Sequence, residues 1–286
     1  MHPIERLRWI ARAEGESSST LAVEAAYSLA ELARHDPAAV VTACRRLLDA
    51  HPRAGPIWWA ASRILGAADL DAEAYELSRL LAGDETPQWL ASGLVELSSR
   101  DGRSDPGPTV VVASPLEELA QVVDCLEASA FAGSLSVRLV GLAPSVRSDL
   151  AHLDAAGIDA AGFSLDEISP ALDGADLVVV GVLGASPGGA AVTSDAALVI
   201  EAAQRDERAS TAGGGLRWRA QVWGVAGVGR VLPRILVLEL ARKAGDGAEI
   251  LSPGLFDLVA GPFGLEEPAR SFERSTCPPA TELVAG

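Results

Sequence analysis

The run ADLVVVGVLGASPGGAAV, residues 175–192, decides which class of fold the sequence can adopt. Its first half, DLVVVG (176–181), is a short and continuous β-branched stretch, typical of a strand buried on both faces of a sheet. Its second half is rich in glycine, like loops that receive phosphate groups, but it contains no Lys, Arg, Asp or Glu. The run therefore predicts a buried strand followed by a loop. This loop is either a working ligand site or has the shape of one without the functional residues.

Three more stretches of the same kind surround this strand and alternate with helical patterns. Continuous apolar strands that alternate with helices predict an α/β fold with a parallel sheet covered on both faces. The strands are expected at TVVVA (109–113), SVRLVG (136–141) and QVWGVA (221–226), with helices near 115–130, 145–156, 190–205 and 254–260.

Residues 1–100 predict a separate domain made of helices. A Ser/Thr cluster at 17–20, the Asp36–Pro37 pair and Pro56 are typical helix starts, and two more helices are expected near 70–82 and 87–99. The segment DGRSDPGP has the composition of a linker, and the end of the chain shows no apolar period. We therefore expect a helical domain at 1–100, a linker at 101–108, an α/β domain at 109–267 and a disordered tail at 268–286 that folding does not need.

Composition limits the possible functions. With 286 residues, 49% of them hydrophobic, the chain can bury one large core or two ordinary ones. The net charge of −16 excludes a nucleic-acid-binding surface and disfavours acidic membranes. The three cysteines lie far apart and the four histidines lack metal-ligand spacing, which predicts no metal, no disulfide and a cytoplasmic location. No cofactor is expected.

The segment ASPLEEL (113–119) follows the first predicted strand and predicts a helix start. Ser114 is the expected N-cap, Pro115 the first helical residue, and Glu117 the partner that completes a capping box. A helix start in this position often binds an anion, because its free N–H groups and its dipole attract negative charge. Since Glu117 and Glu118 already supply that charge, the segment favours a structural role and repels a phosphate group.

Two glycine-rich segments and one basic segment leave alternatives open. The glycines of GVLGASPGG (181–189) and GVAGVGR (224–230) match neither the dinucleotide fingerprint nor the phosphate loop, which favours tight turns. Nucleotide binding by GVAGVGR remains an alternative. RWR (217–219) is interpreted either as an anion clamp or as a solvated loop that enters the next strand.

The segment AHPRAGPIWWAASRIL (50–65) resembles a signature of the initiation factor 2B alpha/beta/delta regulatory-subunit family, which includes isomerases of methylthioribose 1-phosphate and ribose 1,5-bisphosphate. Segments in the same order along the chain are similar to other family elements: SSSTLAVEAAYSLAELA (17–33), ADLVVVG (175–181) and FDLVAGPFG (256–264). The resemblance implies a helical N-terminal domain followed by a Rossmann-like C-terminal domain that forms dimers.

The resemblance also implies where isomerase chemistry would lie, and this sequence departs from it there. The family isomerases have an aspartate after the central strand, where this chain has Leu183, and Asn-Lys further on, where it has Thr193 and Ser194. Their catalytic cysteine follows the first Rossmann strand, in the segment that reads SPLEE here, and Cys125 lies further along. Isomerisation needs a group that moves protons beside a carbonyl, which leucine cannot do.

These departures predict a non-catalytic relative with a degenerate pocket, acting in binding, regulation or assembly with a small phosphorylated metabolite or a protein partner. His51 replaces the phosphate-facing arginine of the family. The alternative is a sugar-phosphate isomerase with relocated catalytic groups, drawn from His51, Arg53 and Asp195. A homodimer is expected from the resemblance and from an apolar segment, 249–260, predicted to be exposed. The predicted pocket residues are His51, Arg53, Ser114, Leu183 and Asp195.

Overall fold

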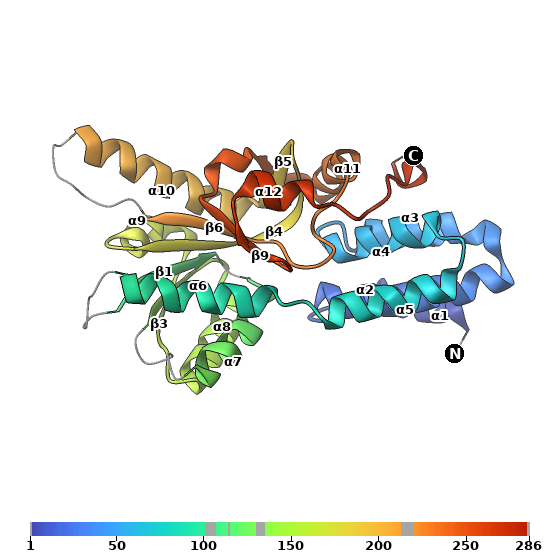
Figure 1. Cartoon of the computed structure of the whole chain (residues 1–286), viewed down its shortest axis with the longest axis horizontal. Coiled ribbons are helices and arrows are strands. Elements are labelled where there is room, and N and C mark those ends of the chain that lie inside the picture. The colour runs from blue at the N-terminus through green and yellow to red at the C-terminus, as the bar shows by residue number, and fades with distance from the viewer. Residues whose placement is uncertain (1, 101–106, 114, 130–134, 213–219, 285–286) are drawn as a thin grey trace.

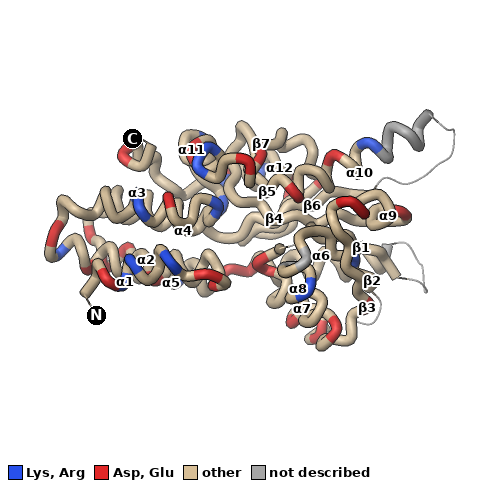
Figure 2. Tube along the Cα trace, turned by 180° about the vertical axis from the view of Figure 1, so that it is seen from behind, with Lys and Arg blue, Asp and Glu red and all other residues tan. Residues whose placement is uncertain are grey.

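A computed structural model describes residues 2–100, 107–113, 115–129, 135–212 and 220–284. The molecule has two halves that lie end to end, one made of the N-terminal helices and the other of a sheet with its covering helices (Figure 1). Asp and Glu residues are distributed over both halves (Figure 2). Within the described residues, no helix combines the length and the apolar character that crossing a membrane requires.

Five helices form the N-terminal half, and their apolar faces share one core. The Ser/Thr cluster caps the second helix as predicted, because the Ser17 side chain accepts a hydrogen bond from the Thr20 N–H at 3.1 Å. Trp58 and Trp59 lie in the core between the helices and are almost completely buried. The helices are α1 (Pro3–Ile10), α2 (Ser18–His35), α3 (Val40–Ala50), α4 (Gly55–Gly66) and α5 (Leu70–Ala82).

The other half contains a mixed sheet with the strand order β3-β2-β1-β4-β6-β8-β9. Its central pairs are parallel, and β9 adds an antiparallel edge. The four strands predicted from apolar runs are all present. The strands are β1 (Thr109–Ala113), β2 (Ser136–Val140), β3 (Asp159–Phe163), β4 (Leu177–Ser186), β5 (Gly189–Thr193), β6 (Gln221–Val225), β7 (Ala248–Leu251), β8 (Leu258–Gly261) and β9 (Gly264–Glu266).

Alternating side chains along each strand assign the helices to the two faces of the sheet. In β1, Val110 and Val112 pack with α6, α7 and α8, whereas Val111 and Ala113 pack with α9, α10 and α12. An α/β fold with both faces covered is therefore confirmed. These helices are α6 (Thr86–Arg100), α7 (Leu119–Ala128), α8 (Ala143–Ala155), α9 (Ile168–Leu172), α10 (Ser194–Ala212) and α12 (Pro268–Glu273). A further helix, α11 (Arg234–Ala244), joins the core of the N-terminal half.

The glycine-rich loop predicted after the central strand is a continuation of that strand. β4 extends to Ser186 and pairs antiparallel with β5, with a bulge between Val182 and Gly184. Because the side chains of Ala185, Ala190 and Ala191 are small, this hairpin is completely buried at those positions. The pairing strand β5 is local, but Ala185 also exchanges backbone hydrogen bonds with Arg230 and Leu232, which only the tertiary fold brings beside it.

Other predicted boundaries also differ from the structure. Helix α6 was predicted with the N-terminal helices, but its apolar side chains Leu90 and Leu94 belong to the core on one face of the sheet. The helix predicted near 254–260 is a short 3-10 turn followed by β8. The apolar segment predicted to be exposed at 249–260 is exposed only in part, with Phe256, Val259 and Ala260 buried in the core and Ile250 at the surface.

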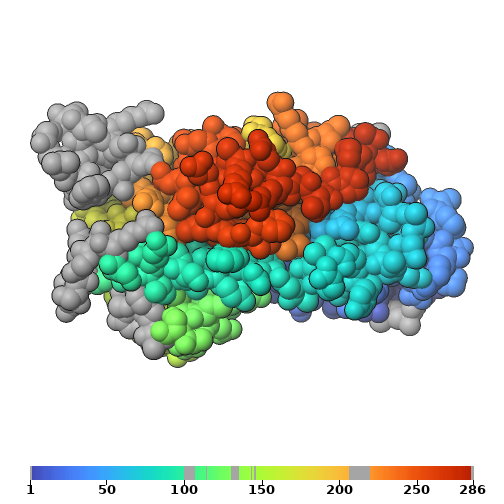
Figure 3. Space-filling view, in the orientation of Figure 1, coloured from blue at the N-terminus to red at the C-terminus, as the bar shows by residue number. Residues whose placement is uncertain are grey.

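The disordered tail predicted at 268–286 is wrong for residues 268–284, which pack on both halves (Figure 3). Phe272 of α12 is fully buried and meets Phe256 edge to face. Further along, the Ser62 hydroxyl donates to the Pro278 carbonyl at 2.5 Å, and Arg45 donates twice to the Glu282 carbonyl. The contacts are spread over short helices and extended chain, so the sequence of this segment shows no period.

Candidate ligand cleft

A cleft of about 570 Å³ lies between the two halves, at the carboxyl ends of β1 and of the parallel part of β4. From these two neighbouring strands the sheet is built toward opposite edges. β2 lies beside β1 on one side, and β6 lies beside β4 on the other. Crevices at such a switch in strand order are the usual ligand sites of open parallel sheets. The helical half contributes the start of α2 and the connection between α3 and α4.

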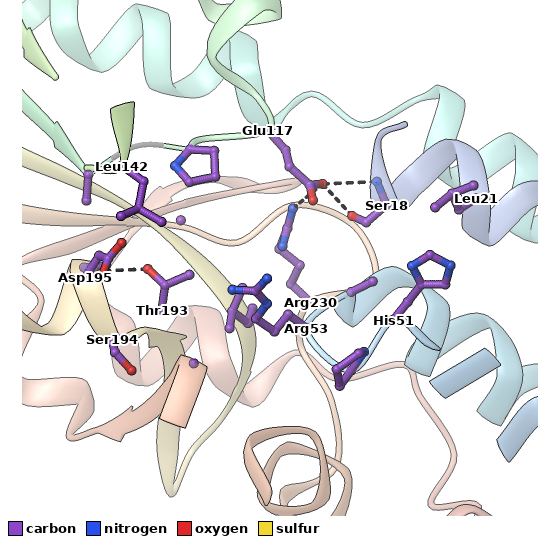
Figure 4. Close-up of a pocket in the computed structure, with 18 of the residues that line it drawn as sticks. Ser18, Leu21, His51, Arg53, Glu117, Leu142, Thr193, Ser194, Asp195 and Arg230 are labelled. Atoms are coloured by element: carbon purple, nitrogen blue, oxygen red, sulfur yellow. Dashed lines mark hydrogen bonds and ion pairs between the residues drawn. The ribbon is translucent and has the colours of Figure 1, made fainter. Parts of the chain in front are cut away.

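Four of the five predicted pocket residues line this one cleft, although they are far apart in the sequence. His51 and Arg53 come from the α3–α4 connection and Asp195 from the first turn of α10 (Figure 4). Leu183 comes from the bulge of β4. The fifth, Ser114, lies outside the described residues. The structure therefore brings these four predicted residues together in one cleft.

The His51 ring is held by the helical half. Its Nε2 atom lies 2.7 Å from the Ile10 carbonyl oxygen. Because a carbonyl oxygen only accepts, this nitrogen carries the proton and donates. Arg53, two residues further on, is exposed and has its guanidinium beside the backbone of Gly247, so it reaches across the cleft toward the sheet half. No hydrogen bond or ion pair holds the Arg53 side chain in the described structure, which leaves its donors free for a ligand.

Gly55, the first residue of α4, sets how closely the halves approach at Leu183. A methyl group on Gly55 would overlap with the Leu183 carbonyl oxygen. On the other side of this contact, Gly229 has a φ of +84° and lies against Pro56 and Trp59. The two glycines let the start of α4 rest directly on the backbone of the sheet. The contact directs the Leu183 carbonyl toward α4, and Leu183 lines the cleft with a partly buried side chain that packs against the core of the helical half.

The strongest polar cluster in the cleft centres on Arg230, which the sequence did not single out. Its guanidinium is 6% exposed and donates from Nη2 to Glu117 and to Glu118, each at 3.0 Å. Nη1 donates to the Val182 carbonyl at 2.9 Å. Burial raises the pKa of Glu118 above its usual value, and the charge of Arg230 opposes that rise. The cluster is thus a buried cation shared by two carboxylates.

Glu117 does not complete the predicted capping box. The helix α7 begins at Leu119, after Glu118, and has no side-chain cap. The Glu117 carboxylate instead accepts hydrogen bonds from Ser18 and Arg230 (Figure 4). The charge repulsion expected from two adjacent glutamates is offset by a buried arginine more than a hundred residues away in the sequence, which no local pattern reveals.

The opposite wall of the cleft is formed by the start of α10 and the segment before β7. The Thr193 hydroxyl accepts a hydrogen bond from the Ala196 N–H at 3.2 Å and caps α10. The Ser194 hydroxyl donates to the Asp246 carbonyl at 2.6 Å. Both hydroxyls therefore have structural partners, and Asp195, in the first turn of α10, adds a carboxylate to this wall (Figure 4).

Two glycines of GVAGVGR, Gly227 and Gly229, pack against residues of the N-terminal segment, whereas Gly224 packs inside the sheet half. A methyl group on Gly227 would collide with the Asp84 carboxylate, which accepts a hydrogen bond from the Val228 N–H at 2.8 Å. This loop thus already holds a carboxylate of the chain itself where a phosphate of a nucleotide would be expected. The geometry favours the tight-turn interpretation over nucleotide binding. RWR (217–219) lies outside the described residues.

The charge balance of the cleft is acidic. Its lining includes five carboxylate residues and two arginines, together with His51. Arg230 is already shared by two of the carboxylates, so Arg53 is the remaining guanidinium for a bound anion among the described lining residues. The five carboxylates belong to Glu16, Glu117, Glu118, Asp195 and Asp246. In the described part of the chain, no group of three His, Cys, Asp or Glu side chains could hold a metal ion.

Comparison with known proteins identifies the fold that contains this cleft. No protein-family model and no curated protein matches the sequence. Solved structures do match. The Pyrococcus horikoshii OT3 translation initiation factor eIF-2B has a TM-score of 0.65 at 14% identity, over 95% of this chain and 98% of that one. The chain has the eIF2B-subunit fold. The tetrameric eIF2B-beta2-delta2 complex from C. thermophilum matches with a TM-score of 0.62 at 17% identity, over 94% of this chain and 93% of that one. The eIF2B beta structure from Chaetomium thermophilum gives 0.61 at 15% identity, over 93% and 88% of the two chains.

The eIF2B-subunit fold confirms the predicted architecture, a helical N-terminal region followed by a mostly parallel sheet with helices. Identities of 14–17% show a shared fold and leave the chemistry of the cleft to be argued from its own residues. In this eIF2B-like cleft no cysteine is among the described lining residues, and Cys125 lies on α7 against the sheet.

Proposed function

We propose that this chain is a non-catalytic relative of the eIF2B subunits, with a degenerate isomerase pocket, that acts in binding, regulation or assembly. The observation that carries the proposal is the composition of the cleft around Leu183. An apolar side chain occupies the bulge of β4, and the nearby arginine, Arg230, is held by two carboxylates of the chain itself. Such a cleft offers neither a proton-transfer group at Leu183 nor a free buried cation for a phosphate.

The matched structures support a role that involves protein partners. One of them is a tetrameric complex of eIF2B beta and delta subunits. We propose that this chain also associates with protein, as a homodimer or with another subunit, and that its cleft binds a small molecule without converting it. A cytoplasmic location is part of the same proposal.

The test is a coupled isomerase assay with methylthioribose 1-phosphate and with ribose 1,5-bisphosphate. We expect no turnover of either compound by the unmodified protein. Leu183→Asp should not create activity, because catalytic groups act as a unit and one carboxylate does not supply the cysteine-bearing segment. Leu183→Asn is the matched control, because asparagine has the shape of aspartate without its charge.

Turnover above about 1 s⁻¹ by the unmodified protein, within the usual range of enzymes, would contradict the proposal. It would favour the alternative, an isomerase with relocated groups. In that case His51→Ala and Asp195→Asn should each reduce the rate by at least about a hundredfold, the usual contribution of a general acid or base.

A further inference from the structure

The Glu117 carboxylate is bound as a ligand would be. One of its oxygens, Oε2, accepts hydrogen bonds from three donors: the Ser18 N–H at 3.3 Å, the Ser18 hydroxyl at 2.5 Å and Nη2 of Arg230 at 3.0 Å. The donors come from both halves of the molecule, since Ser18 begins α2 and Arg230 follows β6. The two halves therefore direct their donors at a single oxygen of Glu117.

These donors have the chemistry of an anion site. Ser18 is the first residue of an 18-residue helix, so its N–H is one of the free amide groups at the positive end of the helix dipole. The Arg230 guanidinium adds a full positive charge and is almost completely buried. A backbone amide, a hydroxyl and a guanidinium that point at one oxygen are what proteins use to hold phosphate or carboxylate groups.

The donors are fixed, whereas the carboxylate that fills the site is more exposed. Ser18 is 3% exposed and the Arg230 side chain 6%, but the Glu117 side chain is 41% exposed. Glu117 belongs to the short connection between β1 and α7 and is outside any helix or strand. It is thus the part of the cluster that can be removed without cutting into a core.

We infer that Glu117 closes an anion site in the cleft, so that the cleft excludes ligands whose phosphate group would need the donors of Ser18 and Arg230. This inference rests on the proposed function and names the class of ligand that the cleft rejects. A phosphate that displaced Glu117 would have to lie beside the buried Glu118, in a cleft whose described lining already has three more carboxylates than arginines. Like charges that approach in a poorly solvated site repel strongly.

The experiment titrates inorganic phosphate and then ribose 5-phosphate into the full-length protein, measured by calorimetry at low ionic strength. The unmodified protein should show no binding up to millimolar phosphate. Glu117→Ala should vacate the donors and tighten phosphate binding by at least about tenfold, because charge-assisted hydrogen bonds to Ser18 and Arg230 become available. The matched control is Glu16→Ala, which removes a carboxylate from the same cleft but none that Arg230 contacts.

Phosphate binding by the unmodified protein, an equal gain in Glu16→Ala, or no gain in a folded Glu117→Ala would each overturn the inference. Glu117→Ser serves as a second vacating variant if Glu117→Ala does not fold, which its melting curve will show. Phosphate binding without turnover by the unmodified protein would overturn this inference alone, whereas turnover of the sugar phosphates would overturn the proposed function.

Discussion

At the scale of single residues, the shape of the cleft depends on two glycines. Gly55 and Gly229 have no side chain at the two points where α4 rests on the sheet. Because these glycines let the helical half approach the sheet closely, His51 and Arg53 share one cleft with Leu183 and Asp195. The sequence around either glycine gives no sign of which backbone will lie against it.

We predict that Gly55→Ala lowers the free energy of unfolding by more than about 2 kcal/mol, the cost expected when an added methyl group forces two packed backbones apart. The overlapping atom is the Leu183 carbonyl oxygen, which is part of a strand and cannot turn away. Denaturant unfolding followed by circular dichroism measures the change.

Gly254→Ala is the control for this prediction. A methyl group there meets only the Ser252 hydroxyl, at 3.7 Å, an ordinary contact distance. Its effect should stay within about 0.5 kcal/mol, as for most surface substitutions. Equal stability of the two variants would show that α4 and β4 are less tightly packed than the structure has them.

At the scale of elements, two segments have a conformation that their own sequence does not predict. The second half of β4 is extended because it pairs with β5 on one edge, and because Ala185 exchanges backbone hydrogen bonds with Arg230 and Leu232 on the other. The C-terminal segment is held by hydrogen bonds from α3 and α4 and by the core of the helical half. Neither segment has a sequence period of its own, and hydrogen-bond partners outside the segment help to decide its conformation.

We predict that truncation after Glu267 destabilises the protein by at least about 3 kcal/mol, the usual cost of removing one buried phenylalanine from a core. Phe272 is fully buried and Leu283 nearly so, and both would be lost. This reverses the expectation from the sequence that the tail is dispensable. Denaturant unfolding of the truncated chain measures the loss.

Glu273→Ala tests whether any change in α12 has this effect, since Glu273 is exposed on the same helix. We expect its stability to match that of the unmodified protein within about 0.5 kcal/mol. A truncated chain that unfolds at the same denaturant concentration as the intact one would mean that the C-terminal segment adds nothing to stability.

At the scale of the whole molecule, four large apolar side chains remain exposed on three elements, of which α10 and α11 each contact the third, β7. They belong to α10, α11 and the edge strand β7, and are 40–48% exposed: Leu198, Ile235, Leu238 and Ile250. Exposed apolar residues that gather around an edge strand are typical of surfaces that meet another chain. This surface, and not the whole segment 249–260, is where we place the proposed dimer contact.

We predict that sedimentation of the unmodified protein shows a dimer, and that the double variant Leu238→Arg, Ile250→Arg sediments as a monomer, because two buried charges at a subunit contact are unfavourable. Tyr75→Arg, at a 65% exposed position on α5 in the other half, is the control and should leave the dimer intact. A monomer at all concentrations of the unmodified protein, or loss of the dimer in the control as well, would contradict this placement.

The sequence by itself determined the α/β class, four of the central strands and most N-terminal helices, because these depend on local patterns of apolar residues and caps. It also identified His51, Arg53, Leu183 and Asp195, which the fold brings into one cleft. Only the tertiary structure decided that Arg230 reaches Glu117 and Glu118, that β4 continues through its glycines, and that the C-terminal segment packs. These features depend on pairs of residues far apart in the sequence, and the physical reason is the same in each: a buried charge, a strand edge or an apolar side chain is satisfied by a partner that no local pattern specifies.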